Sequence, residues 1–261
     1  MLLHKSSIHL NLSSILRADS VQSLCQFIDE GIDSTDVGCW LDEFDATMPT
    51  IVLCCGVIKD EIIINNLSGF RKKYNIYVLQ PIFNAWTDIE ELSHEEIVSR
   101  YLKEMMRDIL RPGSGQVQSD ISCIMGFSYG GELAYHLAVR WQTHTGQKPM
   151  VFMGDTVITD VKPDNRQQPT YKDELEAYYY GLQNEFFSKR KRLSTPDYQG
   201  RVILISAEKE SSYRIANEQE WTAHNTHINI IPVNDTHQGL FENAEHFDEY
   251  LSLIENMSAQ K

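Results

Sequence analysis

The sequence predicts an α/β fold with a mostly parallel, doubly wound sheet, and two observations carry that prediction. Six short apolar runs have the length and composition of buried strands, and segments with helical spacing of apolar residues lie between them. This alternation is typical of parallel sheets, because parallel neighbours need a crossover connection. The strands are expected at residues 50–57, 74–81, 119–126, 148–154, 200–207 and 226–233.

The helical segments are clearest in three places. Residues 94–110 read HEEIVSRYLKEMMRDIL, with apolar residues on one face, and the same spacing recurs from Leu133 to Trp141. A closing helix is expected near residues 243–257.

Length and composition indicate an ordinary globular chain. Its 261 residues, with 42% apolar and 23% charged, suffice for one large domain. The net charge of −14 argues against binding to nucleic acid or to an anionic membrane, since both need a positive field. No stretch resembles a secretory signal or a membrane span, so a cytoplasmic protein is expected.

The five cysteines do not suggest a disulfide framework or a metal centre. Their number is odd, and Cys54, Cys55 and Cys123 lie in apolar strand-like runs rather than at metal-ligand spacing. We therefore expect reduced core residues and no metal at the functional site.

The stretch IMGFSYGGELAYHLAVRW contains the most informative motif. Ser128 lies between Gly126 and Gly130, after a strand and before a helix. A G-x-S-x-G sequence in that context is the nucleophile elbow of α/β hydrolases, where a sharp turn exposes the serine oxygen above the sheet. The alternative is a glycine-rich loop in which Ser128 only caps the helix.

A serine nucleophile needs a base and an acid. Of nine histidines, His237 fits best, because it follows the last expected strand on a polar loop. Asp155 and Glu208 each follow a strand, and the order serine, acid, histidine allows either. From the residues alone, the later strand favours Glu208.

One segment interrupts the alternation of strands and helices. Residues of about 160–198 are flanked by prolines and rich in aromatic side chains. In an α/β hydrolase such an insertion would form a helical lid over the active site, although a surface helix pair would have the same pattern. We expect a main domain at residues 49–258 that carries this lid, and a strand and helix within residues 1–48 packed on it.

Several motifs together resemble the thioesterase domains of non-ribosomal peptide and polyketide synthases. GFSYGGELAYHLA is similar to that family's G-x-S-x-G-G-x-x-A-[YF]-x-x-A, and YNIYVLQPIFNAW resembles P-V-Y-G-L-Q-x-x-G. RVILISAEKE resembles V-x-L-F-x-A-x-E, PVNDTHQGLFE resembles V-P-G-x-H-x-x-L, and Trp221 stands where the family commonly has tryptophan. The resemblance covers roughly residues 48–255 in the family's order.

The resemblance implies an acid after the strand that follows the elbow helix. There the sequence reads MGDT, which favours Asp155 as the acid and leaves Glu208 as the rival. The family's H-P-x-G-G segment is replaced by CCGVIKD, and Val57 falls where one oxyanion donor is expected. The backbone of Tyr129 would supply the other.

The resemblance also implies a substrate and a partner. An acyl, peptidyl or polyketide chain would arrive on the phosphopantetheine of a carrier protein or upstream synthase module, with no cofactor bound to this chain itself. Ser128 would take up the acyl group and release it by hydrolysis or cyclisation, in natural-product biosynthesis such as that of antibiotics. The aromatic residues of the lid segment would line the pocket: Tyr178, Tyr179, Tyr180, Phe186 and Phe187.

Two basic clusters stand out from the acidic background. Carrier proteins are commonly acidic, so the run Lys189, Arg190, Lys191 and Arg192 is a candidate docking site, with FRKKY at residues 70–74 as the next candidate. The alternative is a solvated helix end whose cations complement the helix dipole.

Two other functions are compatible with these motifs. A carboxylesterase or lipase acting on small esters would keep the triad, but its usual H-G-G-G motif is absent and the IYVLQP segment disfavours it. A hydrolase-fold binding module without catalysis is disfavoured by the intact serine, histidine and candidate acids.

Overall fold

A seven-stranded mixed sheet crosses the part of the protein that the computed structural model describes, namely residues 37–56, 60–80, 93–110, 120–157, 197–209 and 211–258. The strand order is β1-β3-β2-β4-β5-β6-β7. All neighbours are parallel except β1, which pairs antiparallel with β3. The strands are β1 (Gly38–Trp40), β2 (Thr50–Cys54), β3 (Asn75–Leu79), β4 (Ile121–Phe127), β5 (Met150–Gly154), β6 (Val202–Ala207) and β7 (Ile228–Val233). The predicted fold class, an α/β fold with a mostly parallel sheet, is confirmed.

Each of the six expected strands is present, usually a few residues shorter than the apolar run that predicted it. Every residue of β2, β3, β5 and β6 is buried, because helices cover both faces of the sheet. Continuous burial explains why these strands read as apolar runs rather than as alternating patterns. The three-residue strand β1 is antiparallel and lies at one edge of the sheet. It falls within residues 1–48, where a strand was expected but not given a position.

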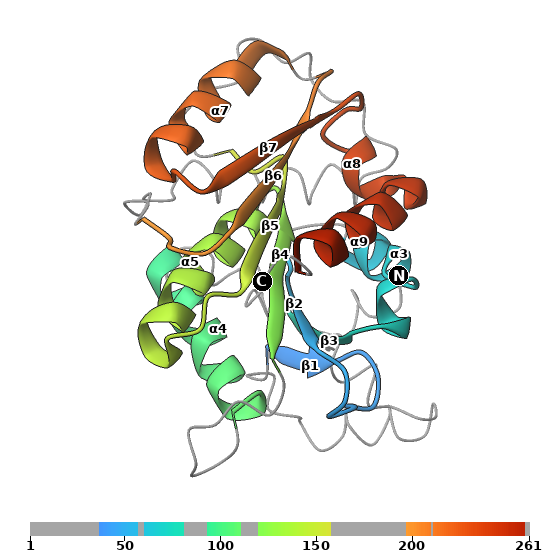
Figure 1. Ribbon diagram of the computed structural model, residues 1–261, viewed down its shortest axis with the longest axis vertical. Coiled ribbons are helices and arrows are strands. Elements are labelled where there is room, and N and C mark those ends of the chain that lie inside the picture. The colour runs from blue at the N-terminus through green and yellow to red at the C-terminus, as the bar shows by residue number, and fades with distance from the viewer. Residues whose placement is uncertain are drawn as a thin grey trace, which may run out of the picture.

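Helices form a layer on each face of the sheet (Figure 1). One layer contains α4 (His94–Asp108), α5 (Tyr129–Thr145) and α7 (Ser211–His224). The other contains α3 (Asp60–Asn66), α8 (Gly239–Glu242) and α9 (Ala244–Ser258). The buried side chains accordingly form two apolar clusters, one on each side of the sheet.

The start of α4 is fixed by local chemistry. Ser93 forms a capping box with Glu96, in which each side chain accepts a hydrogen bond from the other residue's backbone N–H. This cap sets the position of His94, the first residue of the helix. The predicted helix at residues 94–110 is confirmed with an end at Asp108.

β7 borders the sheet among the described residues, and it is only partly buried. It contains Pro232, which pairs in register with Ser206 of β6. The loop after β7 carries His237, so this edge strand supports part of the candidate site.

The four described cysteines, Cys39, Cys54, Cys55 and Cys123, are buried free thiols. Burial raises the pKa of the Cys54 and Cys123 thiols well above the usual range, so both stay protonated. In the described ranges, no helix is both long and apolar enough to cross a membrane. The lid segment at 160–198 lies almost entirely outside the described residues, as do residues 1–36, and the proposed division into domains remains a prediction.

Candidate active site

Ser128 occupies a sharp turn between β4 and α5. Its backbone angles are φ 52° and ψ −122°, a conformation that residues other than glycine rarely adopt. Such strain persists only where the surrounding structure enforces it, and it is concentrated at functional sites. The geometry is that of a nucleophile elbow, in which the serine stands at the carboxyl end of its strand.

The glycines beside Ser128 allow the close packing that this turn requires. A Cβ atom added to Gly126 would lie 2.2 Å from the carbonyl oxygen of Gly130. One added to Gly130 would lie 2.4 Å from the carbonyl oxygen of Cys54 in β2. Both contacts involve backbone atoms that cannot move aside, so the G-x-S-x-G spacing is a steric requirement of the turn.

Asp155 follows β5 directly and lies beside the elbow. The Ser128 N–H donates to the carbonyl oxygen of Gly154 at 2.7 Å, which ties the turn to the residue before Asp155. Asp155 itself has a positive φ of 42° and is only 3% exposed. Its Oδ1 accepts a hydrogen bond from the Ala207 N–H at 3.1 Å, which leaves Oδ2 directed at another partner.

That partner is His237, on the loop that follows β7. Its Nδ1 lies 2.7 Å from Asp155 Oδ2, and its side chain is 30% exposed. The ring also makes an edge-on contact with Phe241 of α8, at 5.8 Å between centroids. A buried carboxylate bonded to Nδ1 fixes the ring orientation and favours the tautomer with a free Nε2, as a general base requires.

Glu208, the rival acid, points elsewhere. Its side chain is 44% exposed, and its Oε1 lies 3.9 Å from the guanidinium of Arg214 on α7. Of the two candidate carboxylates, the structure brings Asp155 and not Glu208 to His237. Within the described residues, the Ser128 hydroxyl makes no hydrogen bond to His237; such bonds are often formed only when substrate binds.

Trp221 supports the turn that holds Asp155. The indole is almost fully buried, and its Nε1 donates to the carbonyl oxygen of Thr156 at 2.9 Å. The Asn217 amide donates to the same oxygen at 3.0 Å. Two side chains from α7 therefore restrain the residue next to the candidate acid, which gives a physical reason for the tryptophan that the sequence motif contains.

A second aspartate–histidine pair restrains the loop that carries His237. Asp235 Oδ2 lies 3.0 Å from His246 Nε2 of α9, and Asp235 Oδ1 accepts from the Thr236 N–H at 2.7 Å. The hydrogen bond with His246 is the main cause that lowers the pKa of Asp235 below its usual value. This pair was not predicted from the sequence, although the aspartate two residues before His237 was a signal that pointed to it.

The two basic clusters differ in what the structure describes. In FRKKY, Arg71 is hydrogen-bonded to Asp42, which lowers the pKa of that carboxyl, and Lys73 lies 2.6 Å from Glu255. Two of its three cations are thus neutralised by carboxylates, and the segment is a weak candidate for docking an acidic partner. The run from Lys189 to Arg192, the five lid aromatics and Val57 lie outside the described residues.

Comparison with solved structures identifies the fold. The thioesterase domain of NocB, from the nocardicin cluster, matches with a TM-score of 0.61 at 18% identity, over 78% of this chain and 92% of that one. The Vlm2 thioesterase domain matches with a TM-score of 0.55 at 17% identity, over 84% of this chain and 96% of that one. No family model matches the sequence, and no curated protein matches it either.

A larger relative matches as well. The four-domain nonribosomal peptide synthetase AB3403 gives a TM-score of 0.61 at 15% identity, over 97% of this chain and 23% of that one. The chain therefore has the α/β-hydrolase fold, in the form found in thioesterase domains of nonribosomal peptide synthetases. The expected fold is confirmed, since these thioesterase domains share it across most of the chain.

Proposed function

We propose that this protein is a serine thioesterase that releases an acyl, peptidyl or polyketide chain from the phosphopantetheine arm of a carrier protein. The observation that supports this most is the pair formed by Asp155 and His237, at 2.7 Å, next to the strained Ser128 turn. Ser128 follows β4, Asp155 follows β5 and His237 follows β7. All three therefore lie at the carboxyl ends of parallel strands, where α/β folds hold their reactive groups.

In the proposed reaction, Ser128 Oγ attacks the thioester carbonyl while His237 takes up its proton. The negative charge that develops on the carbonyl oxygen would be stabilised by the backbone N–H of Tyr129 and a second N–H near Val57. The C–S bond then breaks, His237 gives its proton to the pantetheine sulfur, and the acyl group remains on Ser128 as an ester. Asp155 stabilises the imidazolium formed in between.

The acyl enzyme is resolved by a second nucleophile, whose proton His237 removes. Water gives a linear acid, and an amine or hydroxyl of the chain itself gives a ring. Among the structures similar to this one, NocB is known in covalent complex with a fluorophosphonate nocardicin G analogue, and Vlm2 with a bound dodecadepsipeptide. These complexes support a peptide-like acyl chain as the substrate class.

The proposed partner is a carrier protein or an upstream synthetase module. The match to a four-domain synthetase supports association of this fold with such modules. In the proposal, the run Lys189 to Arg192 attracts the acidic carrier, because the chain as a whole carries a net charge of −14 and would otherwise repel it.

A panel of acyl-pantetheine thioesters, with mass detection of the products, tests this function. We expect turnover that disappears in Ser128→Ala, and the product mass distinguishes the linear acid from the ring. Oxoesters of the same acyl groups serve as the comparison, since a carboxylesterase would prefer them to thioesters. A fluorophosphonate probe tests for the binding module, which would gain no adduct at Ser128.

A further inference from the structure

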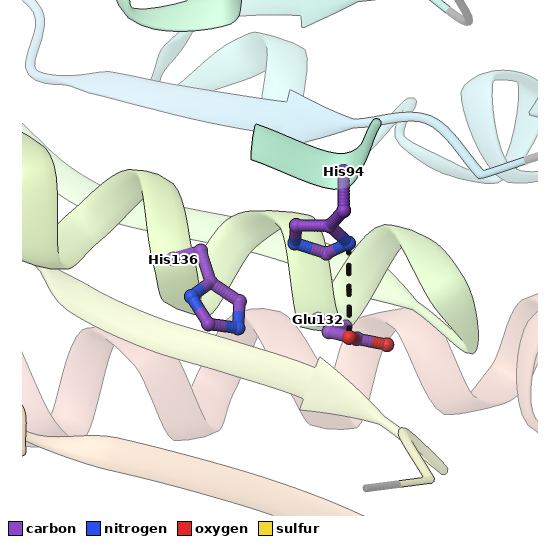
Figure 2. A group of neighbouring side chains, drawn as sticks. All are labelled: His94, Glu132 and His136. Carbon is purple, nitrogen blue, oxygen red and sulfur yellow. Dashed lines mark ion pairs between the residues drawn. The ribbon is translucent and has the colours of Figure 1, made fainter. Parts of the chain in front are cut away.

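Three buried ionisable side chains form a cluster where α4 packs on α5. His94 begins α4, and Glu132 and His136 lie on α5. They are 2%, 6% and 6% exposed, respectively. Figure 2 shows the His94 ring directed from α4 toward α5, with the Glu132 carboxylate beneath it and His136 alongside.

The donor atoms of the cluster lie slightly farther apart than the ligands of one bound ion. One nitrogen or oxygen from each side chain can be chosen such that all three lie within 4.8 Å of one another. His94 Nδ1 is 3.7 Å from Glu132 Oε1, which is too long for a hydrogen bond. Two ligands of a tetrahedral zinc ion are separated by roughly 3.4 Å, given bonds of about 2.0 to 2.2 Å.

The residue types fit the same ion. Two imidazoles and one carboxylate are a known ligand set of Zn²⁺, which accepts nitrogen and oxygen donors together. Glu132 and His136 are four residues apart on α5, so they share a face of that helix. A divalent cation would also place positive charge beside the buried Glu132 carboxylate, and burying a carboxylate is least costly when positive charge lies next to it.

We propose that His94, Glu132 and His136 form a buried site for a zinc ion. The bound ion would link the start of α4 to α5, the helix that follows Ser128. A small rotation of the side chains would bring the three donors from within 4.8 Å of one another to the roughly 3.4 Å that separates ligands of a tetrahedral ion. The Tyr129 hydroxyl is hydrogen-bonded to His94 Nδ1 at 3.3 Å, and a water would complete the four-coordinate site.

Such a site would affect the active site through Tyr129. This residue follows Ser128, and its backbone N–H is the proposed oxyanion donor, while its side chain contacts His94. A metal that fixes His94 against α5 would also restrain the first turn of that helix. The role is structural, and the inference does not depend on the proposed thioesterase activity.

The first experiment measures metal binding by the whole, untagged chain. After treatment with a chelator and its removal, the protein is titrated with Co²⁺, whose visible d–d bands are strong in four-coordinate sites and weak in the aqueous ion, and then with Zn²⁺ by calorimetry. We expect one tight equivalent with four-coordinate bands. Zinc at about 100 times its Kd should raise the midpoint of thermal unfolding by roughly 5 to 10 °C. Failure of the wild-type chain to bind one tight equivalent would overturn the proposal.

Variants then identify the ligands. His136→Gln and Glu132→Gln should each weaken zinc binding by at least about 100-fold, since even second-shell changes cost 10- to 100-fold. His144→Gln is the matched control, because His144 is exposed on the same helix. Circular dichroism establishes that each variant is folded. If folded cluster variants keep the tight equivalent, it lies at other residues and the proposal is wrong. If the wild type binds no metal, a proton shared between Glu132 and an imidazole holds the cluster together instead.

Discussion

Asp155 and His237, 82 residues apart in the chain, meet at 2.7 Å between Oδ2 and Nδ1. The meeting depends on two separate restraints. Asp155 is held by the turn after β5, where Trp221 and Asn217 bind the neighbouring carbonyl. His237 is held by a loop that Asp235 and His246 tie to α9. The predictions below test what this pair and its supports contribute.

Asp155→Asn should lower kcat by about 10³- to 10⁴-fold, because the imidazolium loses its counter-charge and the ring its favoured tautomer. Glu208→Gln should change kcat by less than about tenfold, since this side chain faces Arg214 instead. Steady-state kinetics with a small thioester measure both. The opposite pattern would transfer the role of acid to Glu208.

Ser128→Ala should abolish turnover, and adding His237→Ala should cost little more. Members of a triad act as a unit, because a base without a nucleophile has no proton to accept. The measurement is kcat of the two single variants and the double variant against the uncatalysed rate. Losses that add in free energy would contradict a shared mechanism.

Gly130→Ala should destabilise the protein by about 1 to 3 kcal/mol, because the new methyl group would lie 2.4 Å from the Cys54 carbonyl oxygen in a packed sheet. Gly56→Ala is the matched control, since its Cβ would meet nothing closer than 3.4 Å. Urea unfolding of both variants provides the comparison. Equal stabilities would mean that the elbow is not sterically restricted at Gly130.

Asp235→Asn should lower the unfolding temperature at pH 6, and by progressively less as the pH falls below about 4. The native pKa of Asp235 is depressed, chiefly by its hydrogen bond with His246, so its contribution is complete above the unfolded pKa of about 4. That contribution is lost as the pH falls through the native pKa. Thermal unfolding of wild type and variant across this range measures it. A difference independent of pH would assign the effect to packing.

Reversal of Lys189 and Arg190 to Glu should slow turnover of a carrier-bound substrate by about tenfold or more at low salt. The matching N-acetylcysteamine thioester should be unaffected, because it needs no docking. Reversal of Lys103 and Lys148, both exposed and outside the two basic clusters, changes the net charge equally and serves as the control. If both substrates slow alike, the run supports the structure of the lid; if neither changes, the run has no role in docking.

Features that depend on residues close together in the sequence were predicted correctly, whereas features that depend on how distant segments pack were not. Buried strands were predictable because continuous apolar runs report their burial directly, and the Ser128 turn was predictable because its glycines are neighbours in sequence. Asp155 and Glu208 could not be separated by such reasoning, since both follow strands and only the direction of each side chain distinguishes them. The cluster of His94, Glu132 and His136 was not predicted. It depends on how α4 packs on α5, which no local pattern encodes.

The outer edge of β7 is poorly suited to pairing with a strand of another chain. The carbonyls of His227 and Val233 both point to β6, and successive residues of a strand turn their backbone groups to opposite sides. Pro232 therefore turns its nitrogen outward, and proline has no N–H to offer. Among the described strands, β7 would therefore offer an incoming strand no donor at Pro232, near its carboxyl end, which disfavours both aggregation through sheet extension and recruitment of a partner by strand addition at this edge.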